Sequence, residues 1–179
     1  MQPQSILHFW FVELTPKQHF VKDAALDETI RAQFGDTLEA AARCELFAWR
    51  TTPEGRLAEI IVLDQFSRNV YRDTPRAFAQ DALALVLAQE LVASGQDRSL
   101  PDAQRVFAYM PYMHSESALV HTQALTLFTQ LGMEGNLDFE RRHKAIIDRF
   151  GRYPHRNASL GRMSSTEELA FLSEPGSSF

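Results

Sequence analysis

Ionisable side chains interrupt the apolar stripes of three predicted helices. Asp64 continues the apolar series that follows Pro53, Glu116 extends the stripe of a later helix, and His143 lies four residues after Phe139 in a third. A carboxylate or an imidazole on an apolar face is costly unless it is hydrogen-bonded or used. Asp64, Glu116 and His143 are therefore the candidate catalytic residues, since burial would also tune their pKa values.

Polar residues that could form hydrogen bonds or ion pairs with these groups are concentrated in three segments that follow helices. The segments read LDQFSRN (63–69), MPYMHSE (110–116) and RFGRYPHRNASLGR (149–162). Loops with so many titratable groups are typical of binding sites. The candidate ligand-binding residues are Gln65, Arg68, Asn69, His114, Ser115, Arg149, Arg152, His155, Arg156, Asn157 and Arg162. We expect the three segments to converge, so that Asp64, Arg68, His114, Glu116, His143 and Arg156 form one cluster.

The charge of the chain points to an anionic ligand. The net charge is −5, yet residues 141–162 hold six Arg and one Lys against the single acid Asp148. A guanidinium suits carboxylate and phosphate groups because its fork donates two parallel hydrogen bonds. Arg68, four residues after Asp64, is expected to pair with it. Four arginines would then carry surplus positive charge that an anionic ligand could neutralise: Arg149, Arg152, Arg156 and Arg162.

Other chemistries fit the sequence less well. His114, His143, His155, Glu116 and Asp64 are suitable metal ligands, but no local pattern such as HExxH occurs, so no metal and no cofactor are predicted. The basic segment is short and no nucleic-acid-binding motif is present, which argues against a nucleic-acid partner. Ser115 is expected to be a helix cap before it is a nucleophile, and Cys44 to be a small core residue.

Helix signals dominate the whole chain. No segment alternates with period two over five or more residues, and the β-prone IIVL at 60–63 fits a helical period. The pattern predicts about eight or nine helices joined by short turns. The expected fold class is all-α, a single compact array of antiparallel helices.

Proline, glycine and capping residues mark the expected helix ends. The pairs Thr15-Pro16, Thr52-Pro53 and Thr74-Pro75 each predict a helix start. Gly95, Gly132 and Gly151 predict helix ends. Ser165 with Glu168 forms a capping box, Ser115 is expected to cap the helix after it, Pro111 to close one helix, and Gly35 to separate two others.

Length and composition bound the remaining organisation. A chain of 179 residues with 45% hydrophobic residues is enough for one domain, predicted over 1–179 with a disordered tail from about 173. No stretch approaches 18 apolar residues, and the N-terminus lacks a signal-peptide pattern. With one cysteine and no predicted membrane contact, the cytoplasm is the expected location.

Four stretches resemble an uncharacterised bacterial family, the domain of unknown function nine-two-four. They are ILHFWF, LAEIIVLDQFSRNVYRDTPRAFAQD, FAYMPYMHSE and HKAIIDRFGRYPHRNASLGRMSSTEELAFL. The resemblance covers residues 4–172, and it implies an all-α, tetratricopeptide-like helical repeat without an established reaction. The chain departs from the commonest form at Ser67, where proline is usual, and at Tyr112 and Tyr153, where phenylalanine is frequent.

Two functions remain open from the sequence, beside a purely structural interpretation in which the polar groups are satisfied by one another. The first is the binding of a small anionic ligand in an Arg/His/carboxylate pocket, where this protein itself would act on the ligand as a hydrolase or a lyase. The alternative is a tetratricopeptide-like module that binds a peptide or protein partner and contains a structural polar network. An enclosed pocket would favour the first, and an open groove with exposed side chains the second.

Overall fold

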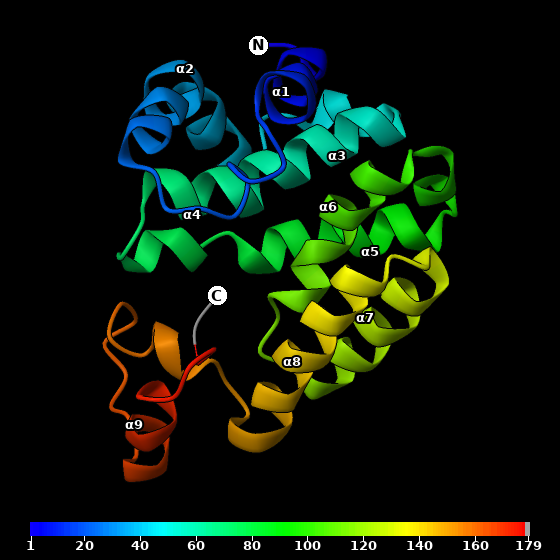
Figure 1. Ribbon diagram of the computed structural model, residues 1–179. Helices are drawn as coiled ribbons and strands as arrows, with labels where there is room; N and C mark the ends of the chain where they lie inside the picture. The colour runs from blue at the N-terminus through cyan, green and yellow to red at the C-terminus, as the bar shows by residue number, and fades with distance from the viewer. Residues whose placement is uncertain (178–179) are drawn as a thin grey trace. The chain divides into compact units, whose positions relative to one another are not determined.

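The computed structural model describes residues 1–177, and this range contains helices and turns without a β-strand (Figure 1). The predicted all-α class is therefore confirmed. The α-helices are α1 (Pro3–His8), α2 (Ala24–Ala42), α3 (Pro53–Ile61), α4 (Ser67–Val70), α5 (Asp81–Ala93), α6 (Asp102–Met113), α7 (Ala118–Leu131), α8 (Glu134–Phe150) and α9 (Thr166–Leu172). Two π-helices, Phe9–Glu13 and Val62–Phe66, and four short 3₁₀ segments complete the set. The 3₁₀ segments are Phe47–Thr51, Pro75–Phe78, Gln96–Ser99 and Pro154–Arg156.

The helices gather into two compact units. The first comprises Met1–Arg72 and Arg76–Pro111, and the second comprises Asp73–Pro75 and the chain from Tyr112 onward. A single domain over the whole chain stays a prediction, as does the tetratricopeptide-like label. In the predicted tail, Ser177 Oγ donates to the Leu172 carbonyl, and residues 178 and 179 lie outside the described residues.

Several predicted helix ends are confirmed by their hydrogen bonds. Thr52 Oγ1 accepts from the Gly55 amide at 3.1 Å and caps α3. Ser165 and Glu168 form the expected capping box at α9. The three glycines predicted to end helices all adopt left-handed φ values near 70° (Gly95, Gly132 and Gly151), which cost glycine little.

Other helix ends differ from the predictions. Gly35 lies inside α2, because the buried stripe Ile30, Phe34 and Leu38 runs past it and one interior glycine costs only about 1 kcal/mol. Thr15-Pro16 starts a series of turns, and α2 begins eight residues after Pro16, where Asp23 accepts from the amides of Ala25 and Leu26.

Three further predictions about local structure are wrong. Ser117, not Ser115, caps α7, so Glu116 precedes the helix and does not extend its stripe. Pro111 lies inside α6, in its last turn, where a proline removes only one intrahelical hydrogen bond. Cys44 is exposed with φ of 60°, because it follows the end of α2.

In the first unit, α3, the π-helix Val62–Phe66 and α4 follow one another directly and supply much of the core (Figure 1). α1 and α5 pack against α3, and α2 packs against α4. Aromatic rings fill the space between them, with Phe34 4.8 Å from Phe9 and 5.1 Å from Phe66 between ring centroids. The wider turn of the π-helix places Asp64 and Gln65, two consecutive polar residues, on the buried side.

In the second unit, α7 and α8 lie side by side as a helical pair (Figure 1). Gly132 ends α7, and Met133 leads directly into α8. After α8 the chain turns through Pro154–Arg156 and reaches α9, which packs against that turn. Ile146, Ile147 and Tyr153 form a buried core cluster against which Phe150 and Phe171 pack. This packing holds Tyr153 in place within the basic segment, residues 141–162.

Candidate functional site

The candidate residues of the first unit form a buried ionic network. Arg68 Nη1 lies 3.0 Å from Asp64 Oδ1, so the predicted pairing is confirmed. The same guanidinium binds both carboxylate oxygens of Asp81, at 2.9 and 3.0 Å. Gln65 Nε2 donates to Asp64 Oδ2 at 2.5 Å. Asp64 is fully buried and is held as a hydrogen-bond acceptor at both oxygens.

Asn69 belongs to a second network in the same unit. Its Nδ2 donates to Asp27 Oδ1 at 2.7 Å, and Arg72 binds both Asp27 oxygens at 2.7 and 2.8 Å. Burial alone would raise the pKa of Asp27, but the hydrogen bonds from Arg72 and Asn69 outweigh it and lower that pKa. Asn69 therefore helps to tie α4 to α2.

In the second unit, side chains hold three consecutive backbone carbonyls at the end of α6. Each carbonyl accepts from a different side chain: Met113 O from Tyr153 Oη at 2.6 Å, His114 O from Arg156 Nη2 at 3.0 Å, and Ser115 O from His121 Nε2 at 2.8 Å. The carbonyls at a helix C-terminus lack intrahelical partners and carry partial negative charge. These donors therefore fix the His114–Glu116 loop against α7 and the basic segment.

Glu116 continues this attachment with its side chain. Arg162 binds both carboxylate oxygens, at 2.6 and 2.9 Å, and the Tyr153 amide donates to Oε1 at 2.8 Å. Burial alone would raise the pKa of Glu116, but these donors outweigh it and lower that pKa. Glu116 is thus a charged acceptor that joins the loop to Tyr153 and Arg162.

Three arginines of the predicted surplus, Arg149, Arg152 and Arg162, are instead bound to carboxylates. Arg162 binds Glu116 as described, Arg149 Nε lies 3.0 Å from Glu167, and Arg152 binds both oxygens of Glu168 at 2.7 and 2.8 Å. The hydrogen bond from Arg152 lowers the pKa of Glu168 to about 2. The surplus was predicted with Asp64 and Glu116 as the acids to be paired, whereas α9 supplies two further acids, Glu167 and Glu168.

Asn157 is also part of the framework. Its Oδ1 accepts from Arg162 Nε at 2.9 Å, and its Nδ2 donates to Ser164 Oγ at 3.0 Å. The residue is 1% exposed. It orients Arg162 toward Glu116.

Nitrogen-bearing side chains gather around the buried ring of Tyr153, which is 0% exposed. The ring centroids of His143 and His155 lie 5.7 and 5.5 Å from that of Tyr153. The Arg156 guanidinium lies 4.5 Å from the Tyr153 ring centroid, within the range of a cation–π interaction. We call His114, His143, Tyr153, His155 and Arg156 the Tyr153 cluster; His114 joins it through its backbone carbonyl, which accepts a hydrogen bond from Arg156.

His143 has an unusual protonation state. Burial lowers its pKa to about 3, and the nearby imidazoles of His114, His121 and His155 act in the same direction. The imidazole is therefore neutral near pH 7. Its Nδ1 donates to the Phe139 carbonyl at 2.7 Å, so Nε2 carries the lone pair and is an acceptor. Such a weakly basic imidazole is better suited to accept a hydrogen bond than to remove a proton at neutral pH.

A buried pair beside this cluster, His121 and Glu140, was not among the residues predicted from the sequence. His121 of α7 and Glu140 of α8 are both 0% exposed, with Nδ1 and Oε1 2.8 Å apart. The signal was present in the spacing Leu137, Glu140 and Ile147. The predicted stripe began instead at Phe139, which is 50% exposed.

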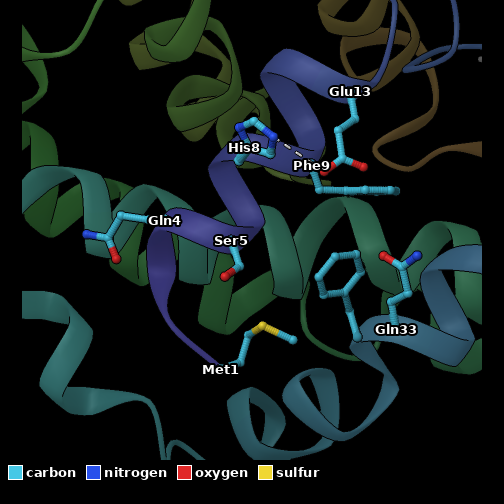
Figure 2. Close-up of a pocket in the computed structure, with 8 residues that line it drawn as sticks. Met1, Gln4, Ser5, His8, Phe9, Glu13 and Gln33 are labelled. Atoms are coloured by element: carbon cyan, nitrogen blue, oxygen red, sulfur yellow. Dashed lines mark ion pairs between the residues drawn. The ribbon is translucent and has the colours of Figure 1, made fainter.

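The first unit also contains a pocket that none of the predicted site residues lines. It has a volume of about 680 Å³ and lies beside α1 (Figure 2). Phe9 and Phe34 provide apolar surface, and the exposed pair of His8 and Glu13, 3.6 Å apart, stands nearby. Gln33 reaches the pocket from α2.

Across residues 1–177, no group of three or more His, Cys, Asp or Glu side chains is arranged to hold a metal ion. In the same range, no helix combines the length and apolar character needed to cross a bilayer.

Fold and site together define an all-helical protein with a cluster of Arg, His and Tyr side chains in its second unit. The chain belongs to the family described as a bacterial protein of unknown function (DUF924), whose model matches residues 6–176. The resemblance inferred from the sequence motifs is thereby confirmed.

One solved structure supports this fold. The chain is similar to the protein of unknown function ATU0120 from Agrobacterium tumefaciens, with 38% identity, 96% of each chain covered and a TM-score of 0.90. No curated protein matches the chain. Neither the family nor this structure assigns an activity, so function has to be argued from the side chains.

Proposed function

We propose that the second unit binds a small anion, a carboxylate or a phosphate group, at the Tyr153 cluster. The observation that carries the proposal is the gathering of Arg156, His143 and His155 around one buried phenol ring. N–H donors held in fixed positions recognise anions because little entropy is lost when the ligand binds.

Local electrostatics support an anion over a cation. Glu116 is already bound to Arg162 through both oxygens, so it offers little attraction to a cation. Arg156 is 6% exposed and is held by the His114 carbonyl and the Tyr153 ring. A guanidinium in such a partly desolvated position interacts with an anion more strongly than one in water does.

The chemistry of His143 favours binding over turnover in this proposal. Since its pKa is about 3, its Nε2 would accept a hydrogen bond from a hydroxyl of the ligand near pH 7. Catalytic roles for His143, Glu116 and Asp64 stay predictions, as does the convergence of the first-unit residues with the second. The proposed compartment is the cytoplasm, where the exposed thiol of Cys44 would stay reduced.

Thermal melts with inorganic phosphate, succinate and chloride at matched ionic strength test the proposal. We expect phosphate or succinate, but not chloride, to raise the Tm of the parent by a few degrees, as ligand linkage predicts. Arg156→Gln should lose this shift. Arg141→Gln should keep it, because Arg141 pairs at the surface with Glu134 and its side chain is 55% exposed.

The quantity compared between variants is the change in Tm on adding the anion, not the Tm without anion. A loss of stability in Arg156→Gln therefore does not affect the interpretation. His155→Gln provides a second variant within the cluster. Equal shifts in the parent, Arg156→Gln and His155→Gln would place the anion elsewhere and overturn the proposal.

A further inference from the structure

His121 and Glu140 form a buried pair that connects the helical hairpin to the His114–Glu116 loop. Glu140 Oε1 lies 2.8 Å from His121 Nδ1. On the other side of the ring, His121 Nε2 lies 2.8 Å from the Ser115 carbonyl and 3.1 Å from Tyr153 Oη. The imidazole therefore joins α8 to the loop through both of its nitrogens.

The partners of Nε2 assign its proton. The Ser115 carbonyl can only accept, so Nε2 must carry hydrogen. Tyr153 donates its own hydroxyl proton to Met113 O at 2.6 Å, which leaves its oxygen as a further acceptor. One proton then lies between Nδ1 and Oε1. The pair is either a neutral imidazole with a carboxylic acid or an imidazolium with a carboxylate.

The environment of the second carboxyl oxygen of Glu140, Oε2, distinguishes between these two protonation states. Oε2 is buried and has no hydrogen-bond partner among residues 1–177, and the whole residue is 0% exposed. An unsatisfied oxygen costs far more in a buried carboxylate than in the carbonyl of a carboxylic acid. We propose that Glu140 is a neutral acid that donates to His121, and that this pair is a latch positioning the His114–Glu116 loop.

Other observations agree with the neutral state. Burial raises the pKa of Glu140, and His121 and Lys144 oppose this only in part. The Lys144 ammonium is bound to Asp148 at 2.6 and 2.8 Å. Tyr153, whose hydroxyl lies 3.1 Å from His121 Nε2, and His143, whose pKa His121 helps to lower, also lie near the pair. Beyond Tyr153 follow Glu116, His155 and Arg156, which contact Tyr153, and the His114 carbonyl, which accepts from Arg156.

The latch links protonation to the geometry of the loop. Loss of the shared proton would leave a carboxylate facing the lone pair of Nδ1, which is unfavourable in a buried site. The pKa of Glu140 is raised in the folded protein. The protonated carboxyl therefore stabilises the folded state fully below its unfolded-state pKa, and this stabilisation is lost as pH rises through the folded-state pKa. The latch itself does not depend on the proposed function. Only its relevance to anion binding, through His114 of the loop, rests on that function.

Infrared spectroscopy and hydrogen exchange, both without added anion, test the latch. The parent at neutral pH should show the carbonyl band of a protonated carboxylic acid, and Glu140→Gln should lack it. Glutamine replaces the acid as a donor to Nδ1, so amide exchange at residues 114–116 should stay within about twofold of the parent. Glu140→Ala removes the donor and should accelerate that exchange about tenfold or more.

The outcomes are distinct. A missing carbonyl band in the parent overturns the neutral acid, whether or not the variants fold. Loop exchange as fast in Glu140→Gln as in Glu140→Ala overturns the latch. Failure of the phosphate melts alone would overturn the anion site and leave the latch standing.

Discussion

Burial sets the protonation state of His143, and the pH dependence of stability tests it. The folded pKa is about 3 against an ordinary value of 6.5, so the stabilisation is full above pH 6.5 and is lost as pH falls toward 3. Linkage then predicts about 2 kcal/mol lower stability at pH 5 than at pH 7 from this residue.

Urea unfolding of the parent and of His143→Asn at both pH values measures this effect. Asparagine keeps a donor for the Phe139 carbonyl but does not titrate, so the difference in stability between the two pH values should shrink by about 2 kcal/mol. His8→Asn is the control, because the His8 side chain is 61% exposed. An unchanged pH dependence in His143→Asn would mean that the imidazole is charged or solvated.

Ser67 supplies a second test at the residue scale. Within the part of the chain that the structure describes, its hydroxyl is buried without a hydrogen-bond partner, so Ser67→Ala should stabilise the protein by about 1 kcal/mol. Ser165→Ala should do the reverse, losing about 1 kcal/mol because it removes the cap of α9. Equilibrium unfolding that shows Ser67→Ala to be the less stable of the two would contradict this account of Ser67.

At the scale of elements, two helical glycines make a matched pair. A Cβ at Gly55 would lie 2.0 Å from the Trp49 carbonyl oxygen, whereas a Cβ at Gly35 would meet nothing within 4 Å. Gly55→Ala should therefore destabilise the protein by about 3 kcal/mol or more, because the backbone of the 3₁₀ segment Phe47–Thr51 cannot yield easily.

Gly35→Ala should stabilise α2 by about 0.5–1 kcal/mol through helix propensity. Thermal denaturation of both variants decides the question. If the two substitutions changed the Tm in the same direction, the close approach of the Trp49 segment to α3 would not be the reason for glycine at residue 55.

The predictability of the helices followed the strength of their local signals. Thr52, Gly132 and the Ser165–Glu168 box act through neighbours in sequence, so their roles could be predicted. Gly35 misled because a buried stripe in α2 outweighs one weak helix former. Ser115 misled because Ser117 is an equally good cap and the choice depends on where the His114–Glu116 loop is held.

At the scale of the whole molecule, the sequence indicated which residue types matter better than how they pair. Asp64 with Arg68 was predictable because both lie on one helical face. Glu116 with Arg162 and Arg152 with Glu168 join distant segments, and many acid–base pairings were equally compatible with the sequence. His121 with Glu140 required the correct buried faces of both α7 and α8, and a shift of one residue in α8 hid it.

The central claim is that a small anion binds at the Tyr153 cluster, and NMR of the imidazoles during a phosphate titration tests it most directly. The signals of His114 and His155 should shift saturably, whereas those of His8 and His19, which lie in the first unit, should not move. Arg156→Gln should abolish the saturable shift. Signals of His114 and His155 that stay still, or that move no more than those of His8 and His19, would contradict the account.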